Sequence, residues 1–230
     1  MKKNLTELVF ILDKSGSMWN LSDDTIGGYN ALLKQNKMME GEALVSTVLF
    51  NHKSQVLHGR VPIEDVVPLT SRDYVPSGCT ALLDAVGGAI HYHEHVQRIL
   101  PPELRPEHTL FCITTDGLEN ASKEYSYARV KHMISAAQER GWEFMFLGAN
   151  IDVAKEADRL GIREDRAMPY EPTPAGMSFA LIRCAEPLLP CDVASRLMAM
   201  ISSAINRFGH RVLLPGATVP FVLSVIRPFS

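Results

Sequence analysis

The chain has 230 residues, of which 46% are hydrophobic, and a formal net charge of −3. That length is sufficient for one globular domain with a substantial core. The near-neutral charge gives no reason to expect nucleic acid or an anionic membrane as a partner, and no stretch approaches the ~20 apolar residues of a membrane-spanning helix. The four cysteines show neither CxxC nor disulfide-framework spacing, so we expect free thiols and a cytoplasmic protein.

Strands and helices are expected to alternate along most of the chain. Apolar runs predict strands at residues 6–13, 42–50, 55–61, 108–115 and 142–148. Helical spacing of apolar residues predicts helices at residues 22–40, 80–97, 123–140 and 151–160. This alternation predicts an α/β fold with a doubly wound, mostly parallel sheet and helices on both faces. The short turn at residues 51–54 predicts a hairpin, so one edge strand should be antiparallel.

The first strand is followed directly by a carboxylate and two hydroxyls. Residues 8–12 form an uninterrupted apolar run, which is typical of a strand covered on both faces, and Asp13, Ser15 and Ser17 come next. Open α/β sheets place ligands at the carboxyl ends of their strands, and hard oxygen donors suit Mg²⁺, Mn²⁺ or Ca²⁺. Taken alone, the segment could instead be a polar turn that caps the next helix.

Two later segments carry the same chemistry. Thr80 follows a glycine turn at the start of a helical pattern, where it could be an N-cap, a metal ligand or both. Asp116 comes directly after the apolar run of residues 110–115. A second carboxylate is therefore expected at a second strand end.

Together, these segments resemble the von Willebrand factor A (vWA) domain family, whose metal-ion-dependent adhesion site (MIDAS) reads Asp-x-Ser-x-Ser, then Thr, then Asp. Asp13, Ser15, Ser17, Thr80 and Asp116 match all five positions in order. The resemblance covers about residues 5–165 and is nearest to small, free-standing bacterial members. It implies that the strands ending in Asp13 and Asp116 lie side by side, with the five ligands in the crevice between them.

The resemblance also implies a function. Two close carboxylates repel each other without a cation. Because hydroxyl ligands offset little of the +2 charge of Mg²⁺, the ion is expected to stay electrophilic and to favour an Asp or Glu side chain of a protein partner. We therefore expect a metal-dependent protein-binding module without catalysis. A metal-dependent phosphoesterase and a domain whose metal is purely structural are the alternatives.

Other side chains near these strand ends are candidates for a rim that contacts the partner. Asn150 and Asp152 follow the strand of residues 142–148 and should emerge beside the metal, although ordinary turn and N-cap roles explain them equally. The same holds for a second pair of candidates just beyond Asp116: Glu119 and Asn120. A third pair, Met18 and Trp19, could form an exposed apolar contact, but such residues more often pack under the loop.

Three histidines in one predicted helix could suggest zinc. His91 and His95 share a helix face, whereas His93 points away from it. No HExxH motif is present. A solvated helix surface is the simpler explanation of all three.

The composition changes near residue 168. Residues 168–230 hold eight of the fourteen prolines and carry a net charge of +2, against −5 for residues 1–167. We expect a vWA domain at residues 1–167 and a C-terminal extension at 168–230, in which residues 192–208 have the spacing of a final packed helix. An appendage, a partner-binding segment and a shifted reading frame all remain open explanations of the extension.

Overall fold

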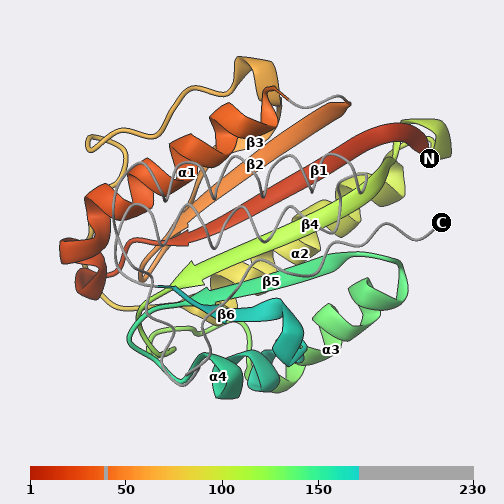
Figure 1. The fold of residues 1–230 in the computed structure, drawn as a ribbon. Coiled ribbons are helices and arrows are strands. Elements are labelled where there is room, and N and C mark those ends of the chain that lie inside the picture. The colour runs from red at the N-terminus through yellow and green to blue at the C-terminus, as the bar shows by residue number, and fades with distance from the viewer. Residues whose placement is uncertain (39–40, 171–230) are drawn as a thin grey trace, which may run out of the picture. The chain divides into compact units, whose positions relative to one another are not determined.

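The computed structural model describes residues 1–38 and 41–170. Its centre is a six-stranded sheet with the strand order β3-β2-β1-β4-β5-β6 (Figure 1). The strands are β1 (Lys2–Asp13), β2 (Glu42–Phe50), β3 (Ser54–Pro62), β4 (Pro106–Thr115), β5 (Glu143–Gly148) and β6 (Ala167–Pro169). The α-helices are α1 (Ser22–Asn36), α2 (Leu82–Ile99), α3 (Tyr127–Glu139) and α4 (Val153–Leu160). Short 3-10 helices are η1 (Gly16–Leu21), η2 (Ile63–Asp65), η3 (Pro102–Leu104) and η4 (Glu164–Arg166).

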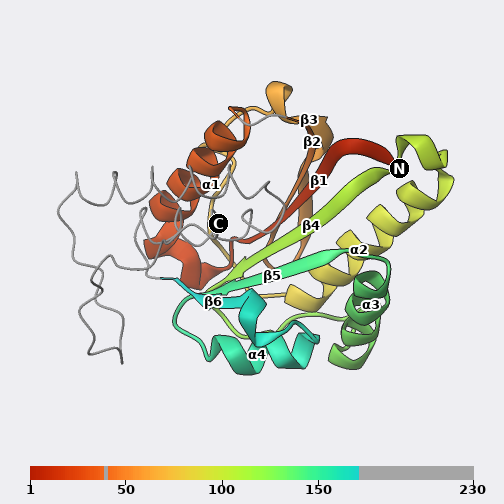
Figure 2. The ribbon, with the colours of Figure 1, turned by 45° about the vertical axis from the view of Figure 1, so that its right-hand side comes forward.

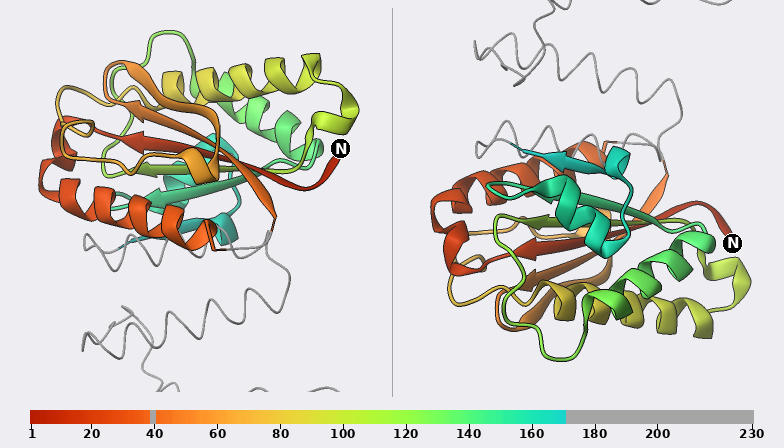
Figure 3. Two further views of the ribbon diagram at one scale, coloured as in Figure 1. Left: turned by 90° about the horizontal axis from the view of Figure 1, so that it is seen from above. Right: turned by 90° about the horizontal axis from the view of Figure 1, so that it is seen from below.

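The helices cover both faces of the sheet. Helix α1 lies on one face, and α2 and α3 lie on the other (Figures 2 and 3). Side chains of β1 alternate between the two layers: the Phe10 ring packs edge-on against Tyr29 of α1, whereas Val9 and Ile11 join the apolar cluster formed with α2, α3 and α4. Since both faces are covered, β1 is buried from Glu7 to its end, which explains its uninterrupted apolar run.

The strand directions bring the polar ends of β1 and β4 together. β1 is parallel to β2 and to β4, with Leu12 opposite Thr114, so Asp13 and Asp116 leave the sheet at the same edge. The chain winds outward from β1 through β2 to β3, and then returns to β4 on the other side of β1. This reversal of winding is where open α/β sheets bind ligands.

The predicted fold class is confirmed. The sheet is parallel except for β3, which pairs antiparallel with β2 at the edge. Helix α3 begins at Tyr127 rather than near residue 123, because the Asp84 carboxylate accepts the backbone N–H groups of residues 123–125 and holds them outside the helix. Ser126 then caps the helix.

The sheet continues past the domain boundary expected after residue 167. β6 pairs parallel with β5, and the buried Tyr170 donates its backbone N–H to the carbonyl of Gly148. A three-residue strand is too short to leave a periodic pattern in the sequence. The helix expected at residues 192–208 lies outside the described residues.

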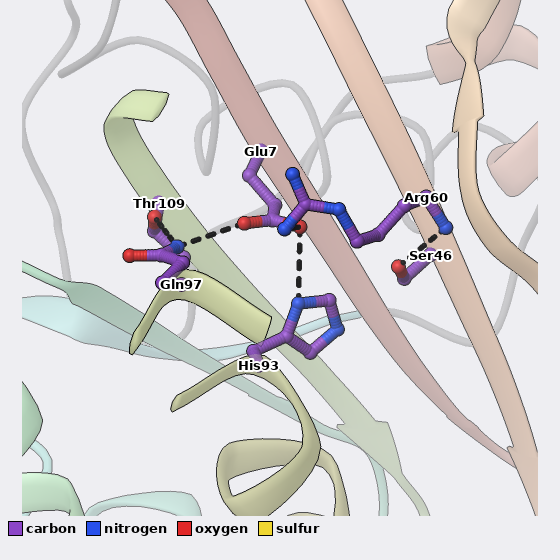
Figure 4. A network of polar contacts seen from close by, with 6 residues as sticks. All are labelled: Glu7, Ser46, Arg60, His93, Gln97 and Thr109. Atoms are coloured by element: carbon purple, nitrogen blue, oxygen red, sulfur yellow. Dashed lines mark hydrogen bonds and ion pairs between the residues drawn. The ribbon is translucent and has the colours of Figure 1, made fainter. Parts of the chain in front are cut away.

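The prediction that all three histidines of α2 lie on a solvated surface is wrong for His93. His91 and His95 are exposed, but His93 is buried, and its Nδ1 lies 3.1 Å from Oε1 of the buried Glu7 in β1 (Figure 4). Arg60 Nη1 of β3 lies 2.9 Å from the same oxygen, and Gln97 donates to Glu7 Oε2. Burial by itself raises the pKa of Glu7, but His93, Arg60 and Gln97 together outweigh that effect and lower it.

None of the helices that the structure describes has both the length and the apolar composition needed to span a bilayer.

Candidate metal centre

Asp13 stands at the end of β1 with both carboxylate oxygens in hydrogen bonds. Oδ1 accepts the backbone N–H of Ser15 at 2.7 Å, and Oδ2 accepts the hydroxyl of Thr115 at 2.6 Å. The side chain is fully buried, and burial, with a smaller contribution from the Asp116 charge, raises its pKa to about 6. A bound cation would offset the cost of holding an anion in this position.

Two serines connect this carboxylate to the second one. Ser17 Oγ donates to Asp116 Oδ1 at 2.5 Å, and the Ser15 and Ser17 hydroxyl oxygens lie 3.2 Å apart. Burial also raises the pKa of Asp116. The loop after β1 and the loop after β4 therefore meet through hydroxyl and carboxylate oxygens.

Thr80 brings a third loop to the same place. A methyl group at Gly117 would lie 3.2 Å from Thr80 Oγ1 and 3.4 Å from Ser17 Oγ, so both hydroxyls face the space left by the missing side chain. The structure thus brings together, from three loops, all five side chains predicted as metal ligands.

Backbone contacts hold these loops in position. The Gly16 N–H donates to the Gly78 carbonyl at 3.0 Å, which joins the first loop to the Thr80 loop. The hydroxyl of Tyr74 donates to the backbone carbonyl of Asp13. Tyr74 and Thr115 support Asp13 directly, yet sequence reasoning missed both; the position of Thr115 immediately before Asp116 was the available signal.

The donor set fits a hard divalent cation. Ligands on adjacent corners of an octahedron with bonds of about 2.1 Å lie about 3 Å apart, and the Ser15–Ser17 and Ser17–Asp116 oxygen separations are 3.2 and 2.5 Å. All of the donors are oxygens, which suits Mg²⁺ or Mn²⁺. Among the described residues, no group of three or more His, Cys, Asp or Glu side chains could hold a metal. A site at this edge therefore depends on the hydroxyls.

Met18 and Trp19, the two apolar candidates for the rim, differ in their exposure to solvent. Met18 is 0% exposed, so the hypothesis that it contacts a partner is wrong: the side chain packs under the loop, as apolar residues in such turns more often do. Trp19, the next residue in η1, is 67% exposed and remains available for contact.

Glu119 and Asn120 hold the Thr80 loop. Asn120 Oδ1 accepts the Thr80 N–H at 2.9 Å, and the Thr80 carbonyl accepts the Asn120 N–H at 3.0 Å. Glu119 Oε2 accepts the N–H of Leu83 at the start of α2, and Oε1 accepts those of Ala121 and Ser122. The carboxylate and the amide oxygen are therefore already occupied by backbone groups.

Asn150 and Asp152 emerge beside Asp116, as predicted. They line an open cleft of about 560 Å³ that runs from the loop after β4 to α4. Asp152 is the N-cap of α4 and accepts the backbone N–H of Lys155 at 3.1 Å. Asn150 is exposed and has a left-handed backbone, with φ of 56°, which asparagine tolerates better than most residues. Leu118 on the cleft wall is 55% exposed.

Comparison by sequence finds no matching protein-family model and no similar curated protein. Comparison by structure finds many similar chains. The vWF domain of the pilus tip protein Mfa5 from Porphyromonas gingivalis matches with a TM-score of 0.54 and 11% identity, over 91% of this chain and 97% of that one. The manganese-loaded TRAP protein of Plasmodium vivax matches with a TM-score of 0.52 and 18% identity, over 71% and 65%.

Proximal thread matrix protein 1 from the mussel byssus, with a zinc-occupied MIDAS motif, matches with a TM-score of 0.53 and 15% identity. The match covers 84% of this chain and 46% of the mussel protein, so the chain spans about half the length of that relative. At identities this low, the structural similarity establishes a shared fold and no shared role. From the strand order of the sheet and these similarities, we conclude that the described part of the chain has the fold of a von Willebrand factor A domain.

Proposed function

We propose that this protein is a metal-dependent protein-binding module that uses Mg²⁺ to hold an acidic side chain of a protein partner. One observation carries the proposal: two buried carboxylates and three hydroxyls, from three loops, meet at the carboxyl edge of the sheet. Asp13, Ser15, Ser17, Thr80 and Asp116 would hold the ion. When bound, Mg²⁺ would offer a coordination position open to a carboxylate, since the protein supplies few negatively charged ligands.

Two structural relatives support the choice of a divalent cation. One of them is manganese-loaded, and another has zinc in its MIDAS motif. The contacts described above support the binding role as well, because Asp13, Glu119 and Asn120 are each engaged in hydrogen bonds that position loops. Neither of the two carboxylates, Asp13 and Glu119, is therefore placed as a free general base beside an open substrate position.

Calorimetric titration of the full chain with Mg²⁺ and Mn²⁺ tests the metal site. Wild-type protein should bind one ion, and Thr80→Ala and Asp116→Ala should weaken that binding while circular dichroism shows an unchanged fold. Equal affinity in both variants would place the metal elsewhere.

A labelled peptide tests the binding role. A fluorescein-tagged Gly-Gly-Asp-Gly-Gln peptide should bind in Mg²⁺ and be released by EDTA, whereas the same peptide with Asn in place of Asp should not bind. Binding that survives EDTA would contradict the proposal. Metal-dependent hydrolysis of p-nitrophenyl phosphate that is lost in Asp116→Ala would instead favour a metallohydrolase.

A further inference from the structure

On the α4 side of the cleft beside Asp116, three side chains bind one another. Glu156 of α4 is 2% exposed, accepts the Tyr127 hydroxyl at 2.5 Å and pairs with Arg159 Nη1 at 3.0 Å. The Arg159 guanidinium also lies 3.6 Å from the centre of the Tyr127 ring. Because these three side chains bind one another, the negative charge of Glu156 is neutralised within the protein.

The other two acidic residues of the cleft are also engaged. Asp116 accepts the Ser17 hydroxyl and belongs to the candidate metal centre. Asp152 accepts a backbone N–H at the start of α4, where a carboxylate is stabilised by the helix dipole. Each carboxylate that lines the cleft therefore has a partner inside the protein.

Lys155 differs from these groups. It is exposed and lines the cleft, and its ammonium group makes no hydrogen bond or ion pair with any residue that the structure describes. Arg159 lies one helical turn further along α4, so the two side chains share a face, and the Arg159 side chain is 45% exposed despite its pairing. Of the five charged side chains that line the cleft, Lys155 is thus the one whose charged group has no hydrogen bond or ion pair within the described residues.

We propose that this cleft is the second half of the partner-binding site and that Lys155 selects partners that carry a second acidic side chain near the one held at the metal. This inference rests on the proposed function. The cleft is continuous with Asp116, so a partner segment that extends from the metal centre toward α4 crosses it, with Leu118 exposed at its wall. An acidic side chain on that segment meets the ammonium group of Lys155, which has no internal partner to lose.

A peptide series tests the inference on the full chain in Mg²⁺. The reference peptide has one Asp followed by Gly and Gln residues, and in each of four further peptides a Glu occupies one of the four positions after the Asp. An exposed ion pair contributes a gain of about two- to fivefold in affinity. At least one peptide with two acids should show this gain, and the gain should shrink as salt is raised.

Lys155→Met should remove the gain, so that the peptides with two acids bind no more tightly than the reference peptide. Lys34→Met is the matched control, because Lys34 is an exposed lysine in the last turn of α1, on the opposite face of the sheet from α2 and α3. That variant should keep the gain.

The outcomes separate the two proposals. If the reference peptide binds in a Mg²⁺-dependent manner but no second acid improves binding, the inference about Lys155 is overturned and the proposed function stands. A gain that persists in Lys155→Met also overturns the inference. If no peptide binds in Mg²⁺, the proposed function fails and the inference fails with it.

Discussion

Replacing Asp13 with Asn should stabilise the metal-free protein. Asp13 is fully buried, and its pKa is raised from 3.8 to about 6. Each pKa unit corresponds to 1.36 kcal/mol, so the charged form of Asp13 lowers the free energy of unfolding at pH 7 by about 3 kcal/mol. Asp13→Asn removes this cost. The amide can keep both contacts, because its oxygen can accept the Ser15 N–H while its NH₂ donates to Thr115 Oγ1, whose proton can turn to the Gly117 carbonyl at 3.0 Å.

The pH dependence has a defined sign. A carboxyl group whose pKa is raised on folding binds more protons in the native state, so its cost grows as pH rises from about 4 to about 6 and is complete at pH 7. Relative to Asp13→Asn, the metal-free wild-type protein should therefore gain about 3 kcal/mol of stability as pH falls from 7 to below 4.

Urea unfolding in EDTA at several pH values measures this effect. Asp65→Asn is the control, because Asp65 is exposed in η2 and surface substitutions usually change stability by less than about 0.5 kcal/mol. In Mg²⁺ the difference between the two proteins should shrink by about half, since an ion at about ten times its dissociation constant adds roughly 1.4 kcal/mol to the wild-type protein and little to Asp13→Asn. If Asp13→Asn is no more stable than wild type in EDTA at pH 7, the inference of a costly buried carboxylate is refuted.

Three further substitutions test particular contacts. Gly117→Ala should weaken Mg²⁺ binding roughly five- to tenfold in calorimetry, because its methyl group would lie 3.2 and 3.4 Å from two of the site hydroxyls; unchanged affinity would mean that this space is not used. Glu7→Gln should cost about 3 to 5 kcal/mol at pH 7 in urea unfolding, and because the pKa of Glu7 is lowered on folding, the difference from wild type should shrink as pH falls below 4.5. Met18→Ala should cost about 2 to 5 kcal/mol in thermal unfolding, whereas Trp19→Ala should stay within about 0.5 kcal/mol because Trp19 is 67% exposed; equal losses would contradict the burial of one and the exposure of the other.

Local patterns in the sequence were sufficient for five of the six strands, the four α-helices and the order of the metal-binding motif. An uninterrupted apolar run marks a strand that is buried on both faces, and a carboxylate directly after it must leave the sheet at the carboxyl end. For this reason the amino-acid sequence alone assigns Asp13 and Asp116 to one edge of the sheet. The cytoplasmic location expected from the cysteines stays a prediction.

Only the tertiary structure decided which groups meet. Ser17 and Asp116 are 99 residues apart, and their hydrogen bond depends on β4 lying next to β1 and on the turns that follow both strands. In the sequence, Glu7 lies just before the apolar run of residues 8–12 and His93 was expected on a solvated helix surface, but β1 and α2 bury the two side chains together. Met18 in η1 is likewise buried. Sequence periodicity indicates which faces of a helix or strand are buried. The partners of a buried charge lie on elements that are distant along the chain and become adjacent only after folding.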